Sequence, residues 1–250
     1  MKVSVIIPAW GRTPYLNEAM AALSVQTFRD FEIICCQPPA NAQNAGAARN
    51  EGLSQATGDW IMFLDADDLP HADWIDKAVA AGERTGAEVV AFKADKVDAV
   101  SGRRSPLPDL VKLSRFADGK AHRLEELGPK RFTTLGTAPW NKAVRAEVIR
   151  KHKIHFQSIK RSNDVAFTVE LLAKAETFCA LDEVLLDYRV NHSTSLQSGN
   201  LKTPFLFLKA LAEARRRLHG RCRTAYWVYW REIVAYNLRS WLLILLRRGF

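Results

Sequence analysis

Short apolar runs alternate with helical segments through the first hundred residues, and this alternation restricts the possible folds strongly. The runs are rich in Val, Ile, Phe and Leu, as expected of strands buried on both faces. They are "VSVIIP" (3–8), "FEIICC" (31–36), "WIMFL" (60–64) and "EVVAFKA" (88–94). Helices are predicted between them, at 14–25, 44–56 and 71–86. Parallel strands need such crossovers, so the sequence predicts an α/β fold with a mostly parallel, Rossmann-like sheet flanked by helices.

The alternation ends near residue 100. Residues 101–140 have weak periodicity. Beyond them, two helices and a strand are predicted, at about 145–152, 164–175 and 183–190. We interpret residues 101–200 as a second, smaller lobe over one edge of the sheet and residues 201–250 as a helical tail.

The net charge of +9 is concentrated at the C-terminal end of the chain. Residues 201–250 contain 11 Lys and Arg but two Asp and Glu, whereas residues 1–200 contain 25 of each kind. A neutral body with a basic tail indicates contact with an anionic surface, either a membrane face or a nucleic acid. The four cysteines have no CxxC spacing and the first apolar run is too short for a signal peptide, so we expect a cytoplasmic protein with reduced cysteines.

Three carboxylates follow the third predicted strand, in "WIMFLDADDLP" (60–70). Asp65, Asp67 and Asp68 repel one another, and buried carboxylates are costly unless something neutralises them. In open parallel sheets, ligands bind beyond the carboxyl ends of the strands, which is where these acids fall. The sequence therefore predicts a site with a neutralising partner, against the alternative that Asp67 or Asp68 caps a helix beginning near Pro70.

Four segments stand in a fixed order along the chain: "VSVIIPAWGR", "GAARNEGLSQATGDWIMFLDADD", "PWNKAVRAEVIRKHKIHF" followed by "NDVAFTVELL", and "LLDYRVNHSTS". Together they resemble the inverting family-two glycosyltransferases of GT-A fold, over roughly residues 1–195. The resemblance implies a GT-A-like fold in which residues 1–100 bind a nucleotide sugar. Residues 101–200 would then supply the acceptor site and the catalytic base, and residues 201–250 form the basic, aromatic-rich tail.

The chemistry of that family supplies a partner for the three acids. The sugar–phosphate bond of a nucleotide-diphosphate sugar breaks to leave a charged diphosphate, which a Mn²⁺ or Mg²⁺ ion held by oxygen ligands stabilises as a Lewis acid. The resemblance implies that Asp67 binds the metal, that Asp65 faces the ribose or a metal-bound water, and that Asp68 shapes the loop. It also places His192 near the metal and the diphosphate, with a surface-loop histidine as the alternative.

Further residues are implied to bind the nucleotide sugar. They are Pro8, Ala9 and Trp10 at the mouth of the first strand, Gln37, Arg49 near the nucleotide, and Ala66 with its flanking acids. Gln37 stands where the family has the first Asp of "DDGS", which contacts the base, so UDP is the default nucleotide and GDP and dTDP stay open. A donor pocket that has lost its function and a purely structural salt bridge for Arg49 are the alternatives.

Transfer with inversion needs a base that takes the proton from the acceptor hydroxyl. The resemblance places the family's Asp on Asp164 in "SNDVAFT", at the start of a predicted helix whose dipole would lower its pKa; a plain helix cap is the alternative. Asn163 replaces the Glu that usually precedes this Asp, which puts some acceptor contacts in question. Trp140 is implied to wall the acceptor pocket, with core packing as the alternative.

The tail sequence "AYWVYWREIVAYNLRSWLLILLRRGF" mixes aromatic residues and Leu with Arg. Its uninterrupted apolar run, Trp241 to Leu246, is far shorter than the roughly 20 residues of a membrane-spanning helix. We expect the tail to lie in the headgroup plane of an anionic bilayer, on the inner face of the cytoplasmic membrane beside lipid-linked acceptors. The alternatives are helices that pack on the sheet or form a dimer contact.

These features predict a metal-dependent inverting glycosyltransferase that moves a sugar from a nucleotide-diphosphate sugar to a hydroxyl of a glycan or lipid-linked acceptor in surface-polysaccharide synthesis. Two other classes fit less well. A sugar-nucleotide nucleotidyltransferase needs a Gly-rich basic loop after the first strand, whereas "PAWGRTPY" has one Gly and one Arg. A non-catalytic nucleic-acid-binding protein leaves the acidic segment and Asp164 unexplained, so no nucleic acid is expected.

Overall fold

The computed structural model describes residues 2–9, 15–42, 44–191, 206–220 and 222–247, and side chains as far as residue 235. Its strands are β1 (Val3–Pro8), β2 (Phe31–Cys36), β3 (Trp60–Phe63), β4 (Leu69–Pro70), β5 (Val89–Asp98), β6 (Arg104–Pro106), β7 (His122–Arg123), β8 (Lys142–Arg145) and β9 (Thr177–Val190). Its α-helices are α1 (Leu16–Ser24), α2 (Ala45–Gln55), α3 (Trp74–Thr85), α4 (Arg131–Leu135), α5 (Ala146–His152), α6 (Asn163–Lys174), α7 (Leu206–Arg217) and α8 (Arg223–Arg247). Two 3₁₀ helices are η1 (Pro108–Phe116) and η2 (Leu124–Lys130).

Within the described residues, nine strands form one sheet in the order β2-β1-β3-β8-β5-β9-β4, with β6 beside β5 and β7 beside β9. The strands β2, β1, β3, β5 and β9 run in one direction, and β8 lies antiparallel between β3 and β5. The α/β fold with a sheet flanked by helices is confirmed. The sheet is mixed, however, because β8 and the short β4, β6 and β7 run against their neighbours.

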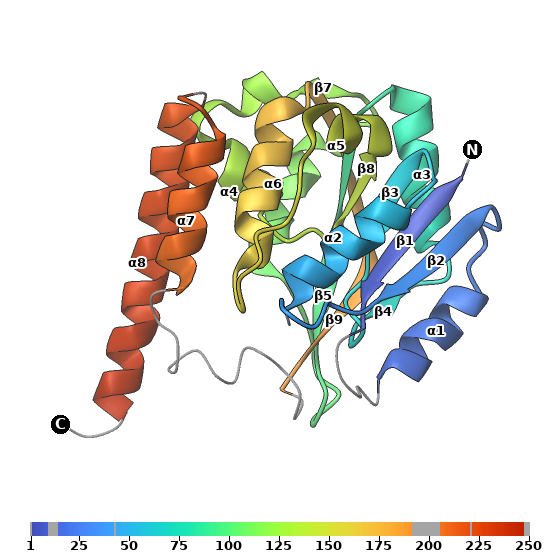
Figure 1. The fold of residues 1–250 in the computed structure, drawn as a ribbon, viewed down its shortest axis with the longest axis horizontal. Coiled ribbons are helices and arrows are strands. Elements are labelled where there is room, and N and C mark those ends of the chain that lie inside the picture. The colour runs from blue at the N-terminus through green and yellow to red at the C-terminus, as the bar shows by residue number, and fades with distance from the viewer. Residues whose placement is uncertain (1, 10–14, 43, 192–205, 221, 248–250) are drawn as a thin grey trace.

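Helices cover both faces of the sheet (Figure 1). Successive side chains of a strand point to opposite faces, so those of β3 meet both helical layers. Trp60 lies against α3, where Gly82 leaves room for the indole, since a Cβ at that position would lie 2.2 Å from Cη2 of Trp60. Phe63 points the opposite way and meets Phe156 and Phe167 edge to face, with ring centroids 5.1 and 5.5 Å apart. β3 is thus buried on both faces, and its end leads into the acidic segment.

The helices and strands predicted up to residue 190 are present, with bounds that shift by a few residues. β5 extends to Asp98 and β9 begins at Thr177. The elements that the sequence pattern does not predict are short: η1, η2, α4 and β8 are each too brief, or too interrupted by residues such as Gly128 and Pro129, to show a period. β8 also begins and ends with charged residues, although its first three are buried.

The C-terminal helices α7 and α8 lie together along one side of the molecule, beside α6 and α4 (Figure 1). Side chains of both helices are buried against the rest of the fold: Ala210, Leu211, Ala214, Tyr226 and Tyr229. The alternative in which the tail helices pack on the sheet is thus met in part: this part of the tail packs on the domain, but mainly against α6, α4 and η2. Among the residues described, no helix has both the length and the hydrophobicity to cross a membrane.

We expect Gly82→Val to lower the free energy of unfolding by about 2 kcal/mol, because the added carbons meet the ring of Trp60 inside a packed core. Urea unfolding of wild type and variant measures the difference. Ala80→Val, at an exposed position of the same helix, is the control and should cost less than about 1 kcal/mol. Equal losses in the two variants would contradict this packing.

Candidate active site

An acidic cluster, consisting of Asp65, Asp67 and Asp68, lies at the carboxyl end of β3. One carboxylate oxygen from each residue lies within 4.8 Å of the others. A turn gathers them, because the N–H of Asp68 donates to the carbonyl of Asp65 at 3.0 Å. Asp68 is 1% exposed, whereas Asp65 and Asp67 are half-buried. The three acids predicted to share a site are therefore brought together at the sheet edge.

Asp68 is held by the end of β9. The backbone N–H of Arg189 donates to its Oδ1 at 2.9 Å, whereas its buried Oδ2 has no hydrogen-bond partner among the described residues. Burial, and then the charges of Asp65 and Asp67, raise the pKa of Asp68 well above its usual range. An unsatisfied buried carboxylate oxygen beside two further carboxylates fits a hard divalent cation, which would neutralise the acidic cluster.

The acidic cluster does not cap the following helix. The two-residue strand β4 comes first and pairs with β9. Helix α3 then begins at Trp74, with Asp73 as its N-cap residue. The capping alternative is therefore wrong for Asp67 and for Asp68.

Arg49 in α2 joins the acidic cluster to the start of α6. Its guanidinium donates to Oδ1 of Asp65 at 2.5 Å and to Oδ1 of Asn163 at 2.8 Å, and 7% of its side chain is exposed. The salt bridge expected as the structural alternative for Arg49 is thus present. Its partner, however, belongs to the acidic cluster, so a structural role and a role at the site do not exclude each other here.

Asp164 occupies the first turn of α6. The N-cap residue of this helix is Ser162, in the left-handed region at φ 54°, so Asp164 is not a plain N-cap. Desolvation raises the pKa of Asp164, and the nearby charge of Arg49 opposes this rise without cancelling it. The raised pKa makes the carboxylate a better proton acceptor than the helix dipole alone would allow.

Two buried side chains interact electrostatically with Asp164. The ammonium of Lys142 in β8 donates to the carbonyl of Ala138 at 2.8 Å and to Oδ1 of Asn141 at 2.7 Å. Burial lowers the pKa of Lys142 to about 7, and the charge of Asp164 opposes that fall. Tyr229 of α8 is 3% exposed, and its pKa is raised by burial and, more weakly, by Asp164. Lys142 could have been found from the sequence, because it belongs to the "PWNK" segment. Nothing in the sequence distinguishes Tyr229 from the other aromatic residues of the tail.

Trp140 packs in the core against a tyrosine of β9. It is 9% exposed and stacks on Tyr188 of β9, with ring centroids 5.0 Å apart and planes at 13°. Burial, and then the charges of Asp68 and Asp65, raise the pKa of Tyr188. The core-packing alternative thus describes this indole, and its stacking partner is the residue that feels the charge of the acids.

The other predicted donor residues lie at the carboxyl ends of β1 and β2. Pro8 ends β1, and the N–H of Ala9 donates to the last residue of β2 at 2.9 Å. Gln37 follows β2 directly and is exposed. Because β1 lies between β2 and β3, these residues share one sheet edge with the acidic cluster, in which Ala66 is buried. Two predicted residues lie outside the part of the chain that the structure describes, Trp10 and His192.

Known proteins share sequence and fold with this chain. Residues 39–152 match the model of the family described as glycosyl transferase family 2. This segment, which includes the acidic cluster and Arg49, is therefore similar to a family-two glycosyltransferase domain. Over 213 residues the chain is 26% identical to the uncharacterized glycosyltransferase EpsJ of Bacillus subtilis, and the match covers 76% of this chain and 61% of EpsJ.

Other proteins similar to this chain come from Staphylococcus aureus. The chain is 24% identical over 204 residues to the poly(ribitol-phosphate) beta-N-acetylglucosaminyltransferase TarP, and the match covers 71% of this chain and 59% of TarP. The crystal structure of S. aureus TarS 1–349 in complex with UDP-GlcNAc matches with a TM-score of 0.71 at 20% identity, over 88% of this chain and 67% of that chain. This likeness shows the GT-A fold. The chain spans about 60% of the length of EpsJ and of TarP.

Lys142 leads to a pH-dependent prediction. Because its pKa is lowered from 10.5 to about 7, the folded state binds fewer protons than the unfolded state between these values. The free energy of unfolding should therefore rise with pH in this window, by at most about 1.4 kcal/mol per pH unit. Urea unfolding at pH 7, 8 and 9 should show a flatter dependence for Lys142→Met than for wild type. Lys112→Met, at an exposed position, should keep the wild-type slope; a wild-type slope in Lys142→Met would contradict the prediction.

Proposed function

We propose that this domain transfers a sugar, with inversion, from a nucleotide-diphosphate sugar to a hydroxyl group, using a divalent cation bound by the acidic cluster. The observation that carries the proposal is the placement of two different carboxylate sites next to each other. The acidic cluster ends β3, Asp164 begins α6, and Arg49 bonds to both sides through Asp65 and Asn163. A leaving group held at the first site and a hydroxyl held at the second would meet at one anomeric carbon.

Each carboxylate has a separate role in this mechanism. Asp67, and Asp68 through its buried Oδ2, would hold Mn²⁺ or Mg²⁺, with Asp65 on the nucleotide side and His192 as a further proposed ligand. When bound, the cation stabilises the charge on the departing diphosphate. Asp164 takes the proton of the acceptor hydroxyl. The oxygen of that hydroxyl attacks the anomeric carbon from the face opposite the leaving group. A glycosidic C–O bond forms, the sugar–phosphate bond breaks, and the configuration inverts.

We propose a UDP-sugar as the donor. TarS, whose fold this chain shares, has been crystallised with UDP and with UDP-GlcNAc. Gln37 is exposed at the end of β2, and its amide both donates and accepts hydrogen bonds, as contact with a base edge requires. GDP and dTDP sugars are alternatives that a binding experiment separates.

We propose a glycan or lipid-linked acceptor in the synthesis of a cell-surface polysaccharide. TarP and TarS are both named poly(ribitol-phosphate) beta-N-acetylglucosaminyltransferases, which supports a polymeric acceptor for this chain. The acceptor would lie on the side of Asn163 and Asp164, with the stack of Trp140 on Tyr188 as its apolar border.

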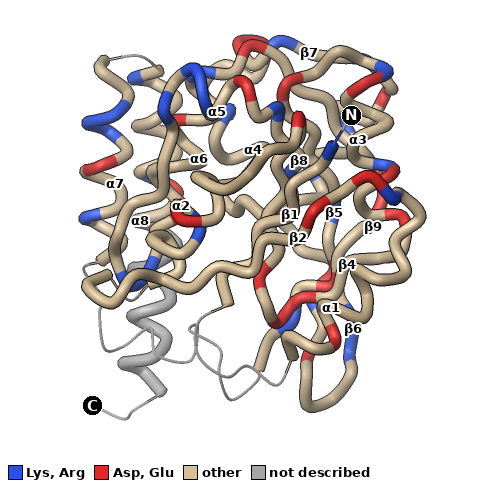
Figure 2. Tube along the Cα trace, turned by 45° about the vertical axis from the view of Figure 1, so that its right-hand side comes forward, with Lys and Arg blue, Asp and Glu red and all other residues tan. Residues whose placement is uncertain are grey.

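We also propose that α7 and the start of α8 contact an anionic membrane from its cytoplasmic side. Figure 2 shows basic residues along α7. The exposed residues of this surface combine cationic and large apolar side chains: Lys209, Arg215, Leu208 and Trp227. The guanidinium of Arg215 lies 5.3 Å from the ring centroid of Trp227, which is 45% exposed. Cationic side chains around an exposed Trp suit the headgroup region of an anionic bilayer. Binding there would bring the domain close to lipid-linked acceptors.

Thermal-shift measurements with UDP, GDP, dTDP and CMP, each with and without Mn²⁺, test the donor site. We expect UDP with Mn²⁺ to raise Tm by about 5–10 °C, since a ligand at about 100 Kd stabilises the folded state by about 2.7 kcal/mol. Asp67→Ala should lose most of this shift, and Glu51→Ala, which removes an exposed acid of α2, should keep it. No shift with any nucleotide would contradict the donor proposal, and a shift with GDP or dTDP would reassign the base.

Asp164→Asn should lower kcat by about 10²- to 10⁴-fold, because it removes the proton acceptor and keeps the shape of the side chain. The assay measures UDP released from UDP-GlcNAc with poly(ribitol-phosphate) as acceptor, and the Tm shift with UDP and Mn²⁺ should be retained. Asp76→Asn, which neutralises the first-turn acid of α3, is the matched control and should keep wild-type kcat. If Asp164→Asn also kept wild-type kcat, Asp164 would not be the base.

The double variant Lys209→Gln/Arg215→Gln should bind phosphatidylserine vesicles about 30-fold more weakly at low salt, since each basic residue near an anionic surface contributes about 1 kcal/mol. Co-sedimentation with the vesicles measures the binding. Lys112→Gln/Arg115→Gln, which removes the same charge from exposed positions of η1, should bind like wild type. Failure of the wild-type protein to sediment with the vesicles would exclude the membrane contact.

A further inference from the structure

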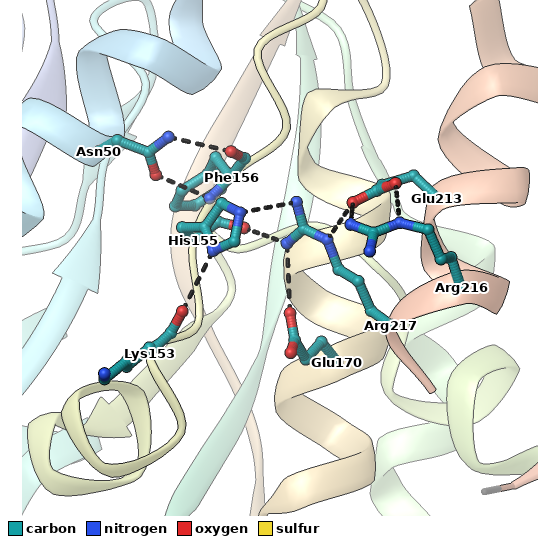
Figure 3. A network of polar contacts seen from close by, with 8 residues as sticks. All are labelled: Asn50, Lys153, His155, Phe156, Glu170, Glu213, Arg216 and Arg217. Carbon is teal, nitrogen blue, oxygen red and sulfur yellow. Dashed lines mark hydrogen bonds and ion pairs between the residues drawn. The ribbon is translucent and has the colours of Figure 1, made fainter. Parts of the chain in front are cut away.

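Helix α7 reaches the segment before α6 through one buried arginine (Figure 3). Arg217 stands in the last turn of α7 with 6% of its side chain exposed. Its guanidinium donates to the backbone carbonyl of His155 and lies 3.2 Å from Nε2 of the same residue. Glu213 of α7 at 2.7 Å and Glu170 of α6 at 3.2 Å neutralise it. Two helices and the 153–157 segment therefore meet at one side chain.

The residue after His155 is held from the opposite side by α2. Asn50 accepts a hydrogen bond from the N–H of Phe156 at 2.7 Å and donates to its carbonyl at 2.9 Å (Figure 3). The ring of Phe156 stacks on Phe167 of α6, with centroids 3.9 Å apart, and the Arg49 guanidinium lies 5.3 Å from its centroid. His155 and Phe156 are thus fixed between α7 and α2.

From there, the chain leads directly to the start of α6. The N–H of Gln157 donates to the carbonyl of Asn163 at 3.3 Å, and Asn163 precedes Asp164. The packing at this junction is tight, because a Cβ at Gly46 of α2 would lie 2.3 Å from the carbonyl oxygen of Gln157 and 2.9 Å from Cβ of Asn163. A displacement of the 153–157 segment would therefore be passed on to the first turn of α6.

We propose that Arg217 is a positioning residue for sugar transfer: from the C-terminal helix it fixes the 153–157 segment, and through that segment the place of Asp164 relative to Arg49. The inference rests on the proposed function of Asp164 and gives the tail a part in the reaction itself. A lysine keeps the charge of Arg217 but lacks the planar fork that contacts the carbonyl and the ring of His155 together. Misplacement of a catalytic group by about 1 Å costs about 100-fold in rate.

Arg217→Lys and Arg216→Lys form a matched pair in the same helical turn. Both keep a cation beside Glu213, so both should fold; Arg216 pairs with Glu213 but is 68% exposed. We expect Arg217→Lys to lower kcat at least about tenfold with the KM for UDP-GlcNAc within about twofold of wild type, because the acidic cluster is untouched. Arg216→Lys should keep wild-type kcat. Equal kcat values in the two variants would overturn the proposal.

Hydrogen exchange tests the same inference without any activity. In Arg217→Lys, amides of residues 153–167 should exchange at least about tenfold faster than in wild type, while those of β1 and β3 keep wild-type rates. Arg216→Lys should leave all of these rates unchanged. A lowered kcat with unchanged exchange at 153–167 would overturn the proposal, since the effect would not pass through that segment. If wild type transfers no sugar, the proposed function fails, and the exchange rates alone decide whether Arg217 fixes the segment.

Discussion

The contacts of the Arg49 guanidinium are the interactions on which this site depends. Three carboxylates at the end of one strand are tolerated in a folded protein when opposite charge compensates them, and Arg49 provides part of that charge from a neighbouring helix. The same guanidinium holds the side chain of Asn163, the first residue of α6. One buried cation therefore couples the electrostatics of the strand end to the position of the helix that carries Asp164.

The departure from the family at Asn163 is accommodated by this arrangement. The amide oxygen of Asn163 accepts from Arg49 at 2.8 Å, and its amide nitrogen donates to the carbonyl of Ile159 at 3.3 Å. An ionised Glu could replace the first contact but, as an acceptor without donors, could not make the second. The neutral residue also leaves Asp164 without a second carboxylate directly beside it in the sequence, so that desolvation and Arg49 decide its proton affinity.

What the sequence could predict is what is local in it. The strands and helices of the first hundred residues follow from patterns within a few residues, and the acidic cluster from three neighbouring positions. The partners of Arg49 are 16 and 114 positions away, so no local pattern contains them. β8 was not predicted, because a lysine such as Lys142 is normally expected at the surface. Its burial is explained only by the fold, in which its ammonium donates a hydrogen bond to the carbonyl of Ala138. The composition of the tail indicated an exposed cationic surface. It could not show which of the tail aromatics are buried against the domain, as Tyr226 and Tyr229 are.

The position of β8 joins the two halves of the chain in one sheet. This strand comes from the second half of the chain, yet it is hydrogen-bonded on one side to β3 and on the other to β5, both from the first half. The half of the chain with the acidic cluster and the half with Asp164 therefore contribute strands to one continuous sheet, and they cannot move apart as rigid bodies without breaking its hydrogen bonds. A chain cut at residue 100 would leave facing edges of β3 and β5 with no strand between them, so neither half is a module that could be exchanged by itself.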